Sequence, residues 1–185
     1  MHELILGGAR SGKSRAAEAR AAAWLQQTGR RATLLATAEA GDEEMAERIR
    51  RHQADRARRV PALAAIEVGR DLVGALQRES ADGHLLVVDC LTLWLTQCAM
   101  PASGPALAPA AIEAAIDELV RALHGARGPV VLVSNEIGLG VMPMGAETRR
   151  FVDLLGWLHQ AVAACCSRVT LMVAGHGLAV KGPAR

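Results

Sequence analysis

The stretch LILGGARSGKSRAAEARAAAWLQQ, residues 4–27, decides the fold. It opens with a short apolar run from Leu4 to Leu6, continues through glycines and small polar residues, and ends in a segment rich in Ala, Arg and Glu from Lys13 to Gln27. Such a pattern predicts a strand, a loop and a helix in that order. The loop, residues 7–14, matches GxxxxGK[ST] between these two elements, which is typical of a loop that binds phosphate groups.

The residue types in this loop predict how a nucleotide is held. Glycines let the backbone curl, so that its N–H groups and the positive end of the helix surround a β-phosphate. Lys13 can reach the β- and γ-phosphates and is a candidate catalytic residue, and Ser14 can ligate Mg²⁺. A glycine-rich turn that only caps a helix is the alternative. The nucleotide-binding residues predicted here are Gly7, Gly8, Ala9, Arg10, Ser11, Gly12, Lys13 and Ser14.

Apolar runs and helical patterns alternate along the rest of the chain. We expect further strands at 32–36, 85–88, 130–133 and 169–173, and helices at 42–58, 110–123 and 147–164. Continuous apolar strands separated by helices predict an α/β fold with a mostly parallel central sheet and helices on both faces. The length of 185 residues fits one nucleotide-binding catalytic domain, residues 1–185.

Composition argues against several classes of protein. A formal charge of +2 and an aromatic content of 2% are unlike a nucleic-acid-binding protein. No apolar run has the length of a membrane span, and the N-terminus lacks the pattern of a signal peptide. The four cysteines, at positions 90, 98, 165 and 166, have no zinc-site spacing. They favour a reducing cytoplasm.

Asp89 follows a buried strand and is a candidate magnesium ligand together with Ser14. Phosphate-binding loops of this kind usually work with a carboxylate at the end of a neighbouring strand. The alternative is that Asp89 caps the helix that begins near Leu91.

Four other residues have two interpretations each. Asn135 and Glu136 follow a buried strand at the edge where open α/β sheets bind ligands, so they either position substrate or magnesium, or cap the turn into Gly138. Trp94 and Trp157 lie in helical patterns. They are better explained as core or subunit-contact residues than as a platform for a large ligand.

The segment 42–58 predicts an exposed helix. Acids stand in its first turn and arginines crowd its second half. Glu44 with Arg48, and Glu47 with Arg51, have the i,i+4 spacing of stabilising ion pairs.

Met45, Ile49 and His52 fall on one stripe of this helix. A histidine on an apolar stripe is usually a packed, hydrogen-bonded side chain. The alternative is a nucleophile, because the surrounding arginines attract a triphosphate whose phosphorus a neutral imidazole can attack.

Five motifs in order extend the argument over almost the whole chain. They resemble the bifunctional adenosylcobinamide kinase / adenosylcobinamide-phosphate guanylyltransferase family of cobalamin biosynthesis. The motifs are GGARSGKS at 7–14, ATAEA at 36–40, DEEMAERI at 42–49 with His52, VDCLTLWL at 88–95 and SNEIGLG at 134–140.

This resemblance implies an enzyme with two activities on a P-loop NTPase, RecA-like fold. It phosphorylates the aminopropanol hydroxyl of adenosylcobinamide with ATP or GTP. It then transfers GMP from GTP through a covalent GMP–histidine, giving adenosylcobinamide-GDP and pyrophosphate. The resemblance further implies Mg²⁺, a homotrimer, and His52 as the nucleophile. Residues outside the loop that it assigns to the nucleotide site are Ala36, Thr37, Ala38, Gln53, Ala54, Asp55, Arg56 and Asp89.

The sequence departs from the family after His52. The family's Arg-Pro, Trp and Thr-x-Glu are replaced by a run from Arg56 to Pro61 with no Trp, and no Thr stands before Glu67. Glu67 is the candidate for the family's nucleotide-contacting glutamate. Two other readings remain open: a small-molecule kinase with a single activity, and a non-enzymatic nucleotide switch or assembly ATPase.

Overall fold

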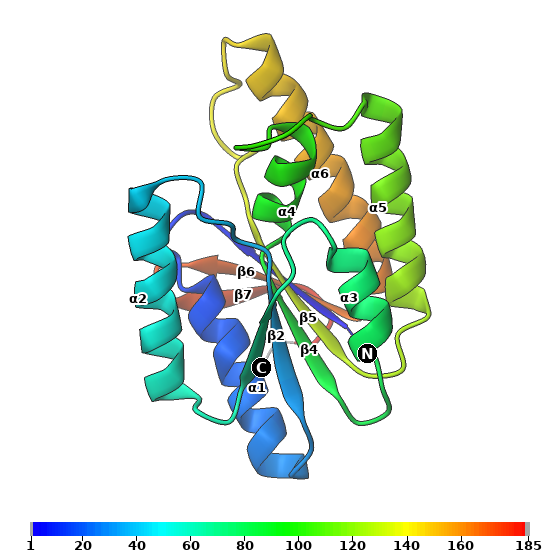
Figure 1. Ribbon diagram of the computed structural model, residues 1–185. Coiled ribbons are helices and arrows are strands. Elements are labelled where there is room, and N and C mark those ends of the chain that lie inside the picture. The colour runs from blue at the N-terminus through cyan, green and yellow to red at the C-terminus, as the bar shows by residue number, and fades with distance from the viewer. Residues whose placement is uncertain (1, 184–185) are drawn as a thin grey trace.

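The computed structural model describes residues 2–183 as a seven-stranded sheet with helices on both faces (Figure 1). The strands are β1 Glu3–Gly7, β2 Ala32–Ala36, β3 Ala64–Glu67, β4 Leu85–Asp89, β5 Val130–Asn135, β6 Arg168–Val173 and β7 His176–Lys181. The helices are α1 Lys13–Thr28, α2 Glu43–Arg59, α3 Leu72–Glu79, α4 Leu91–Ala99, α5 Pro109–His124 and α6 Ala146–Cys165.

The strand order is β3-β2-β4-β5-β1-β6-β7, and every neighbouring pair is parallel except β6 with β7. Parallel strands need crossover connections, and helices supply them here. This arrangement confirms the predicted α/β class with a mostly parallel central sheet.

The core lies on both faces of the sheet, because successive side chains of a strand point to opposite sides. Leu4 packs on the face covered by α3, α4, α5 and α6, whereas its neighbour Ile5 packs on the face covered by α1. Both side chains are fully buried. Continuous apolar strands are therefore what this sheet requires.

The structure contains three elements that the sequence did not predict. Strand β3 has four residues, all exposed, and α3 is one of the shorter helices, with eight residues. Strand β7 follows the strand at 168–173, which we had expected to be the last, and its six residues are exposed on the edge of the sheet. Short or exposed elements leave little hydrophobic pattern to detect.

The strands next to β1 are β5 and β6, and not β4, the strand that ends at Asp89. Strand β5 lies between β1 and β4, so Asp89 stands two strands away from Gly7, and the residue paired beside Gly7 is Asn135. The N-cap of α4 is Cys90 rather than Asp89. The carboxylate of Asp89 is therefore not used as a helix cap.

Within residues 2–183, no helix has the length and apolar character that would suffice to cross a membrane.

Candidate active site

A cleft of about 950 Å³ opens at the carboxyl edge of the sheet, between the phosphate-binding loop and α2. The loop contributes residues 9–14, and the ends of β2, β4 and β5 contribute Ala36, Asp89 and Asn135. The third wall is α2, which stands beside α1 and apart from the sheet (Figure 1). Ligands of open α/β sheets bind at this edge.

The phosphate-binding loop has the curled backbone that the glycines predict. Gly7 has φ +154°, and a Cβ there would lie 2.5 Å from the Met172 carbonyl oxygen; Gly12 has φ +99°. The buried Ser11 hydroxyl has no hydrogen-bond partner within residues 2–183. A buried polar atom without a partner is costly, so this hydroxyl is suited to a ligand oxygen.

Lys13 is buried at the start of α1, and its Nζ donates a hydrogen bond of 2.6 Å to the Gly8 carbonyl oxygen. Burial lowers the pKa of the Lys13 ammonium from 10.5, while Cys90 and Asp89 act in the opposite direction. The ammonium thus lies inside the curl of the loop, where phosphate oxygens bind in such loops.

Asp89 lies at the base of the cleft. Burial raises the pKa of its carboxyl group from 3.8, and a hydrogen bond with Ser14 and the nearness of His52 and Lys13 oppose that rise. The same cleft therefore brings together Lys13, Ser14, His52 and Asp89, which come from three separate parts of the sequence.

Thr37 lies beneath the cleft, fully buried, and holds the end of β4 in place. Its hydroxyl donates to the Cys90 carbonyl oxygen at 2.7 Å and accepts from the Cys90 N–H at 2.8 Å. Its own N–H donates to the Asp89 carbonyl oxygen at 3.0 Å, and Gln97 donates to its carbonyl oxygen. Thr37 thus fixes the backbone from the Asp89 carbonyl group through Cys90.

Helix α2 begins after Asp42, whose carboxylate accepts a hydrogen bond from the Met45 N–H. None of the residues of α2, all of which the structure describes, is buried. Its C-terminal end is attached to α1 by Arg59, whose Nε and Nη2 donate to the two carboxylate oxygens of the buried Glu18 at 2.7 and 3.2 Å. This bidentate contact fixes one end of the helix beside the phosphate-binding loop.

The i,i+4 ion pairs predicted for α2 were wrong. Glu47 pairs with Arg50 at 2.6 Å, and Glu44 and Arg48 make no ion pair with each other in the described structure. Arg51 instead lines the cleft, as Arg48 does. The arginine side chains on the inner face turn toward the cleft, where a polyanion would sit, rather than along the helix surface.

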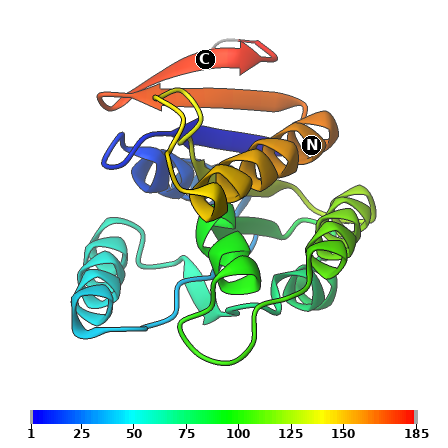
Figure 2. The ribbon, with the colours of Figure 1, turned by 90° about the horizontal axis from the view of Figure 1, so that it is seen from above.

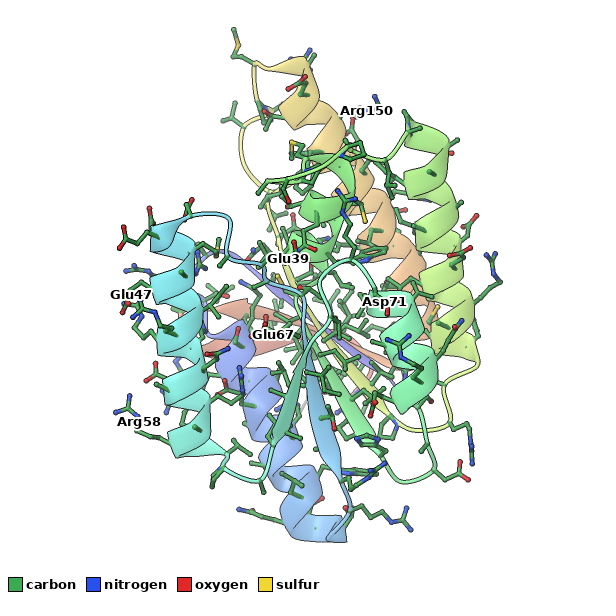
Figure 3. The ribbon with its side chains drawn as sticks, in the orientation of Figure 1. Glu39, Glu47, Arg58, Glu67, Asp71 and Arg150 are labelled. Carbon is green, nitrogen blue, oxygen red and sulfur yellow. The ribbon has the colours of Figure 1, made fainter. Side chains whose placement is uncertain are left out.

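His52 is exposed to solvent but lines the cleft. This placement rules out a histidine packed in the core. Figure 3 shows Arg58 pointing away from the sheet, near the C-terminal end of α2. Arg58 does not line the cleft, whereas His52 and Glu47 do, so the imidazole faces the same cleft as the phosphate-binding loop.

Three arginines stand on the wall around His52, beside the acidic side chains of Glu44, Glu47 and Asp55. Arg48, Arg51 and Arg56 line the cleft, and none of them pairs with a carboxylate within the part of the chain that the structure describes. Unpaired guanidinium groups suit the oxygens of a triphosphate. Of these three, sequence reasoning had selected Arg56 alone as a site residue. Arg48 and Arg51 could have been found from the helical period, which places both of them on the same face of the helix as His52.

Glu67, at the end of β3, lines the same cleft and accepts a hydrogen bond of 3.1 Å from the side chain of Gln53. The residue that follows His52 is therefore linked to the candidate glutamate, in spite of the altered spacing between them.

The other predicted site residues are placed as follows. The cleft is also lined by Ala9, Arg10, Ser11, Gly12, Ala38, Asp55 and Arg56. Gly7, Gly8 and Ala54 do not line it, although Gly7 and Gly8 shape the loop.

The structure shows the capping role for Glu136, and the positioning of substrate or magnesium stays a prediction. Asn135 lines the cleft, and its N–H donates to Thr92 Oγ1 at 2.7 Å. Glu136 Oε1 caps the following turn by accepting from the Gly138 N–H at 2.6 Å. Its Oε2 lies 3.7 Å from Nδ1 of His159.

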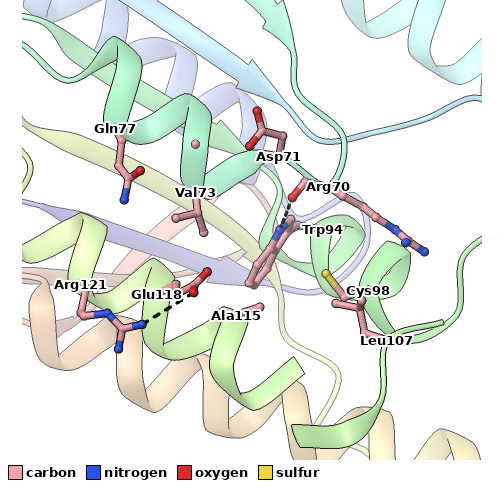
Figure 4. A pocket seen from close by; sticks show the side chains of 11 residues that line it. Arg70, Asp71, Val73, Gln77, Trp94, Cys98, Leu107, Ala115, Glu118 and Arg121 are labelled. Atoms are coloured by element: carbon pink, nitrogen blue, oxygen red, sulfur yellow. Dashed lines mark hydrogen bonds and ion pairs between the residues drawn. The ribbon is translucent and has the colours of Figure 1, made fainter. Parts of the chain in front are cut away.

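A second cavity of about 660 Å³ lies between α3, α4 and α5 and shares no lining residue with the cleft (Figure 4). Trp94 stands in its wall, but the side chain is only 1% exposed and its indole N–H donates to the Arg70 carbonyl oxygen at 3.2 Å. Trp94 is therefore a core residue, as predicted. Trp157, on α6, is 39% exposed.

Comparison with known proteins agrees with this geometry. A family model described as cobinamide kinase / cobinamide phosphate guanyltransferase matches residues 3–180. The chain is 46% identical over 182 residues to a bifunctional adenosylcobalamin biosynthesis protein CobP of Pseudomonas aeruginosa, with 98% of each chain covered. It is 33% identical over 187 residues to the CobU protein of the same description from Salmonella typhimurium, with 96% of this chain and 98% of that protein covered. The Escherichia coli CobU protein is 31% identical over 186 residues, with the same coverage.

Proposed function

The chain belongs to the cobinamide kinase / cobinamide phosphate guanyltransferase family of cobalamin biosynthesis, and from that premise we propose that the cleft beside the phosphate-binding loop serves both reactions. Membership sets aside the single-activity kinase and the nucleotide switch. The observation that carries the proposal is that the phosphate-binding loop and His52 line one cleft. A nucleotide bound there can be attacked at its γ-phosphate or at its α-phosphate.

In the kinase step, the loop holds the β- and γ-phosphates of ATP or GTP. Lys13 moves from the Gly8 carbonyl oxygen to the phosphate oxygens, and the free hydroxyl of Ser11 gains a partner. The hydroxyl oxygen of the aminopropanol arm attacks the γ-phosphorus, the bond from that phosphorus to the bridging oxygen breaks, and a nucleoside diphosphate leaves. Positioning and charge stabilisation by the loop supply most of the catalysis.

Residues Ser14 and Asp89 fit a magnesium site. Within residues 2–183 no group of three or more His, Cys, Asp or Glu side chains is arranged to hold a metal. Mg²⁺ does not need such a cage, because it binds through one or two hard oxygens together with substrate phosphates. Ser14 and Asp89 interact with each other at the cleft and supply such oxygens. Mg²⁺ held by them would offset the charge of the phosphates.

In the transfer step, a ring nitrogen of His52 attacks the α-phosphorus of GTP. The bond from the α-phosphorus to the bridging oxygen breaks, pyrophosphate leaves, and GMP stays bound through a phosphorus–nitrogen bond. A phosphate oxygen of cobinamide phosphate then attacks the same phosphorus, and the bond to His52 breaks. Arg48, Arg51 and Arg56 stabilise the charge that develops on the phosphates.

The remaining predicted residues have supporting roles in this proposal. Ala36, Ala38, Gln53, Asp55 and Glu67 line the cleft and contact the nucleoside. Thr37 acts through Asp89 by holding its backbone. The bidentate contact of Arg59 with Glu18 keeps His52 within reach of the loop.

Labelling with GTP that carries ³²P at the α-phosphate tests the transfer step. Purified protein with Mg²⁺ and no cobinamide should acquire label that is stable to alkali and lost in acid, as a phosphoramidate is. His52→Asn should acquire none, whereas His124→Asn, at an exposed histidine on α5, should label as the parent does. Label that survives in His52→Asn would refute the assignment.

Three further features belong to the proposal. We propose that residues 1–185 act as one catalytic domain, that the protein is a homotrimer, and that it works in the cytoplasm. The four free cysteines support a reducing compartment. Light scattering coupled to size-exclusion chromatography tests the trimer directly.

A further inference from the structure

The loop between β5 and α6 exposes a cluster of apolar side chains. We call residues 137–145, IGLGVMPMG, the apolar loop. Val141 is 98% exposed and Met144 is 96% exposed, and Ile137, Leu139 and Met142 are exposed as well. Monomeric proteins rarely expose a contiguous apolar patch of this kind, and such patches mark ligand or partner sites.

The apolar loop is tied down at both ends. At its start, the Glu136 carboxylate accepts from the Gly138 N–H and lies 3.7 Å from the buried His159. At its far end, Arg149 donates to the carbonyl oxygens of Pro143, at 3.2 Å, and Met144. The loop is thus held in a shape that presents its apolar side chains outward.

The base of the apolar loop touches the nucleotide cleft. The Glu136 N–H donates to the Gly7 carbonyl oxygen at 3.0 Å, and Asn135, the preceding residue, lines the cleft. A buried chain from His159 through Ser134 to Thr92 supports this base. Seen from above in Figure 2, the loop rises over the same edge of the sheet as the phosphate-binding loop.

The cleft itself does not have room for both substrates. Pockets for ligands of ordinary size span roughly 300–1,000 Å³. A cleft of about 950 Å³ is of the size that a nucleoside triphosphate and the aminopropanol arm occupy together. A corrin macrocycle added to them would extend out of the cleft, with the arm reaching in.

The chemistry of the two walls selects the side on which the macrocycle lies. The α2 wall is densely charged, with Arg48, Arg51 and Arg56 beside Glu44, Glu47 and Asp55. The apolar loop contains no charged residue. It offers the apolar contact that the edge of a macrocycle needs, whereas burying the charged side chains of α2 against the macrocycle would be costly.

We propose that the apolar loop is the docking surface for the corrin macrocycle of cobinamide, placing the aminopropanol hydroxyl beside Asn135 at the γ-phosphate. This rests on the proposed function, because it assumes that the hydroxyl is phosphorylated in the cleft. In this proposal, the side chains of Val141 and Met144 contact the macrocycle and contribute to the affinity for the corrinoid.

The variant Val141→Ser/Met144→Ser tests the docking surface. Both side chains are almost fully exposed, so folding should be unaffected. The matched control is Leu178→Ser/Val180→Ser, which removes two exposed apolar side chains from β7. Kinase assays at saturating ATP give KM and kcat for adenosylcobinamide, labelling by GTP without corrinoid tests the nucleotide site, and sedimentation velocity gives the oligomeric state.

We expect KM for adenosylcobinamide to rise about tenfold or more in the loop variant, with kcat and GMP labelling within about twofold of the parent. The control should match the parent throughout. An unchanged KM, or an equal rise in the control, overturns the proposal. An unchanged KM with an altered sedimentation coefficient overturns it too, and assigns the loop to a contact between copies. Failure of the parent to label would instead count against the proposed function.

Discussion

Replacing Thr37 by Val removes a clamp from beneath the active site while keeping the shape of the side chain. Val has nearly the same volume as Thr, so no cavity forms at this fully buried position. The two hydrogen bonds to the backbone of Cys90, at 2.7 and 2.8 Å, are lost. The buried N–H and carbonyl groups of Cys90 are then left without these partners.

The cost follows from the N–H group, because the Cys90 carbonyl oxygen still accepts a hydrogen bond of 3.2 Å from the Trp94 N–H. A buried group left unsatisfied costs about 1–3 kcal/mol, so we expect a loss of that size in the free energy of unfolding. For a chain of this size, each kcal/mol lowers Tm by about 2–4 °C, which gives a fall of about 2–12 °C. Both reactions should also slow, because Thr37 holds the backbone that carries Asp89.

Calorimetric melting of the Val variant beside a Thr37→Ser variant separates the hydroxyl from the methyl group. The Ser variant keeps the hydroxyl and loses one methyl, so it should cost only about 1 kcal/mol. A Val variant that melts within about 2 °C of the parent, or a Ser variant that is equally destabilised, would refute the role of the hydroxyl.

Three other substitutions test separate parts of the structure. Arg59→Met leaves the buried Glu18 carboxylate without its guanidinium partner. We expect the free energy of unfolding, measured by urea denaturation, to fall by about 1–2 kcal/mol. This loss is below the roughly 3–5 kcal/mol of a fully buried pair because the Arg59 side chain is 39% exposed. Partial recovery in Glu18→Gln/Arg59→Met would identify the unpaired carboxylate as the cause, and no recovery would exclude it. Lys13→Met should lower kcat of the kinase by about 10²-fold or more, because a charge beside the phosphates is lost. It should not lower Tm, because burial of the ammonium is itself unfavourable. A variant with the kcat of the parent would contradict the role of Lys13. Burial, together with the charge of Arg31, lowers the pKa of His84 below 6.5. As pH falls below 6.5, the unfolded chain therefore takes up a proton at His84 before the folded chain does. The neutral His84 thus contributes fully to stability above pH 6.5, and this contribution is lost as pH falls below that value. His84→Asn should flatten the fall in unfolding free energy between pH 6.5 and 5, and an unchanged slope would contradict this.

The sequence predicts the central part of the fold well because that part is buried on both faces. The strands at 32–36 and 85–89 appear where the apolar runs stand, and the helix at 13–28 follows the glycine-rich loop as expected. At the edges of the sheet, exposed strands such as 64–67 carry no run of apolar residues, and pattern alone could not find them.

Sequence reasoning selected residues with distinctive chemistry, but it could not supply their geometry. Lys13 and His52 were selected from motif and spacing, and both line the cleft, while their roles stay predictions. The order of strands is a long-range property, so the position of β5 between β1 and β4 could not be derived from local pattern. For the same reason, the buried contact of Thr37 with Cys90 was not predictable.

Helix α2 contributes no buried residue to the hydrophobic core. The residues that we propose for the second reaction are therefore largely separate from the residues that stabilise the fold. The residues of α2 are all at least partly exposed, so substitutions along it carry little folding penalty, except at Arg59, which is paired with the buried Glu18. If His52 has the role that we propose, evolution or engineering can therefore alter the transfer reaction, or lose it with the histidine, while the sheet and its phosphate-binding loop continue to fold.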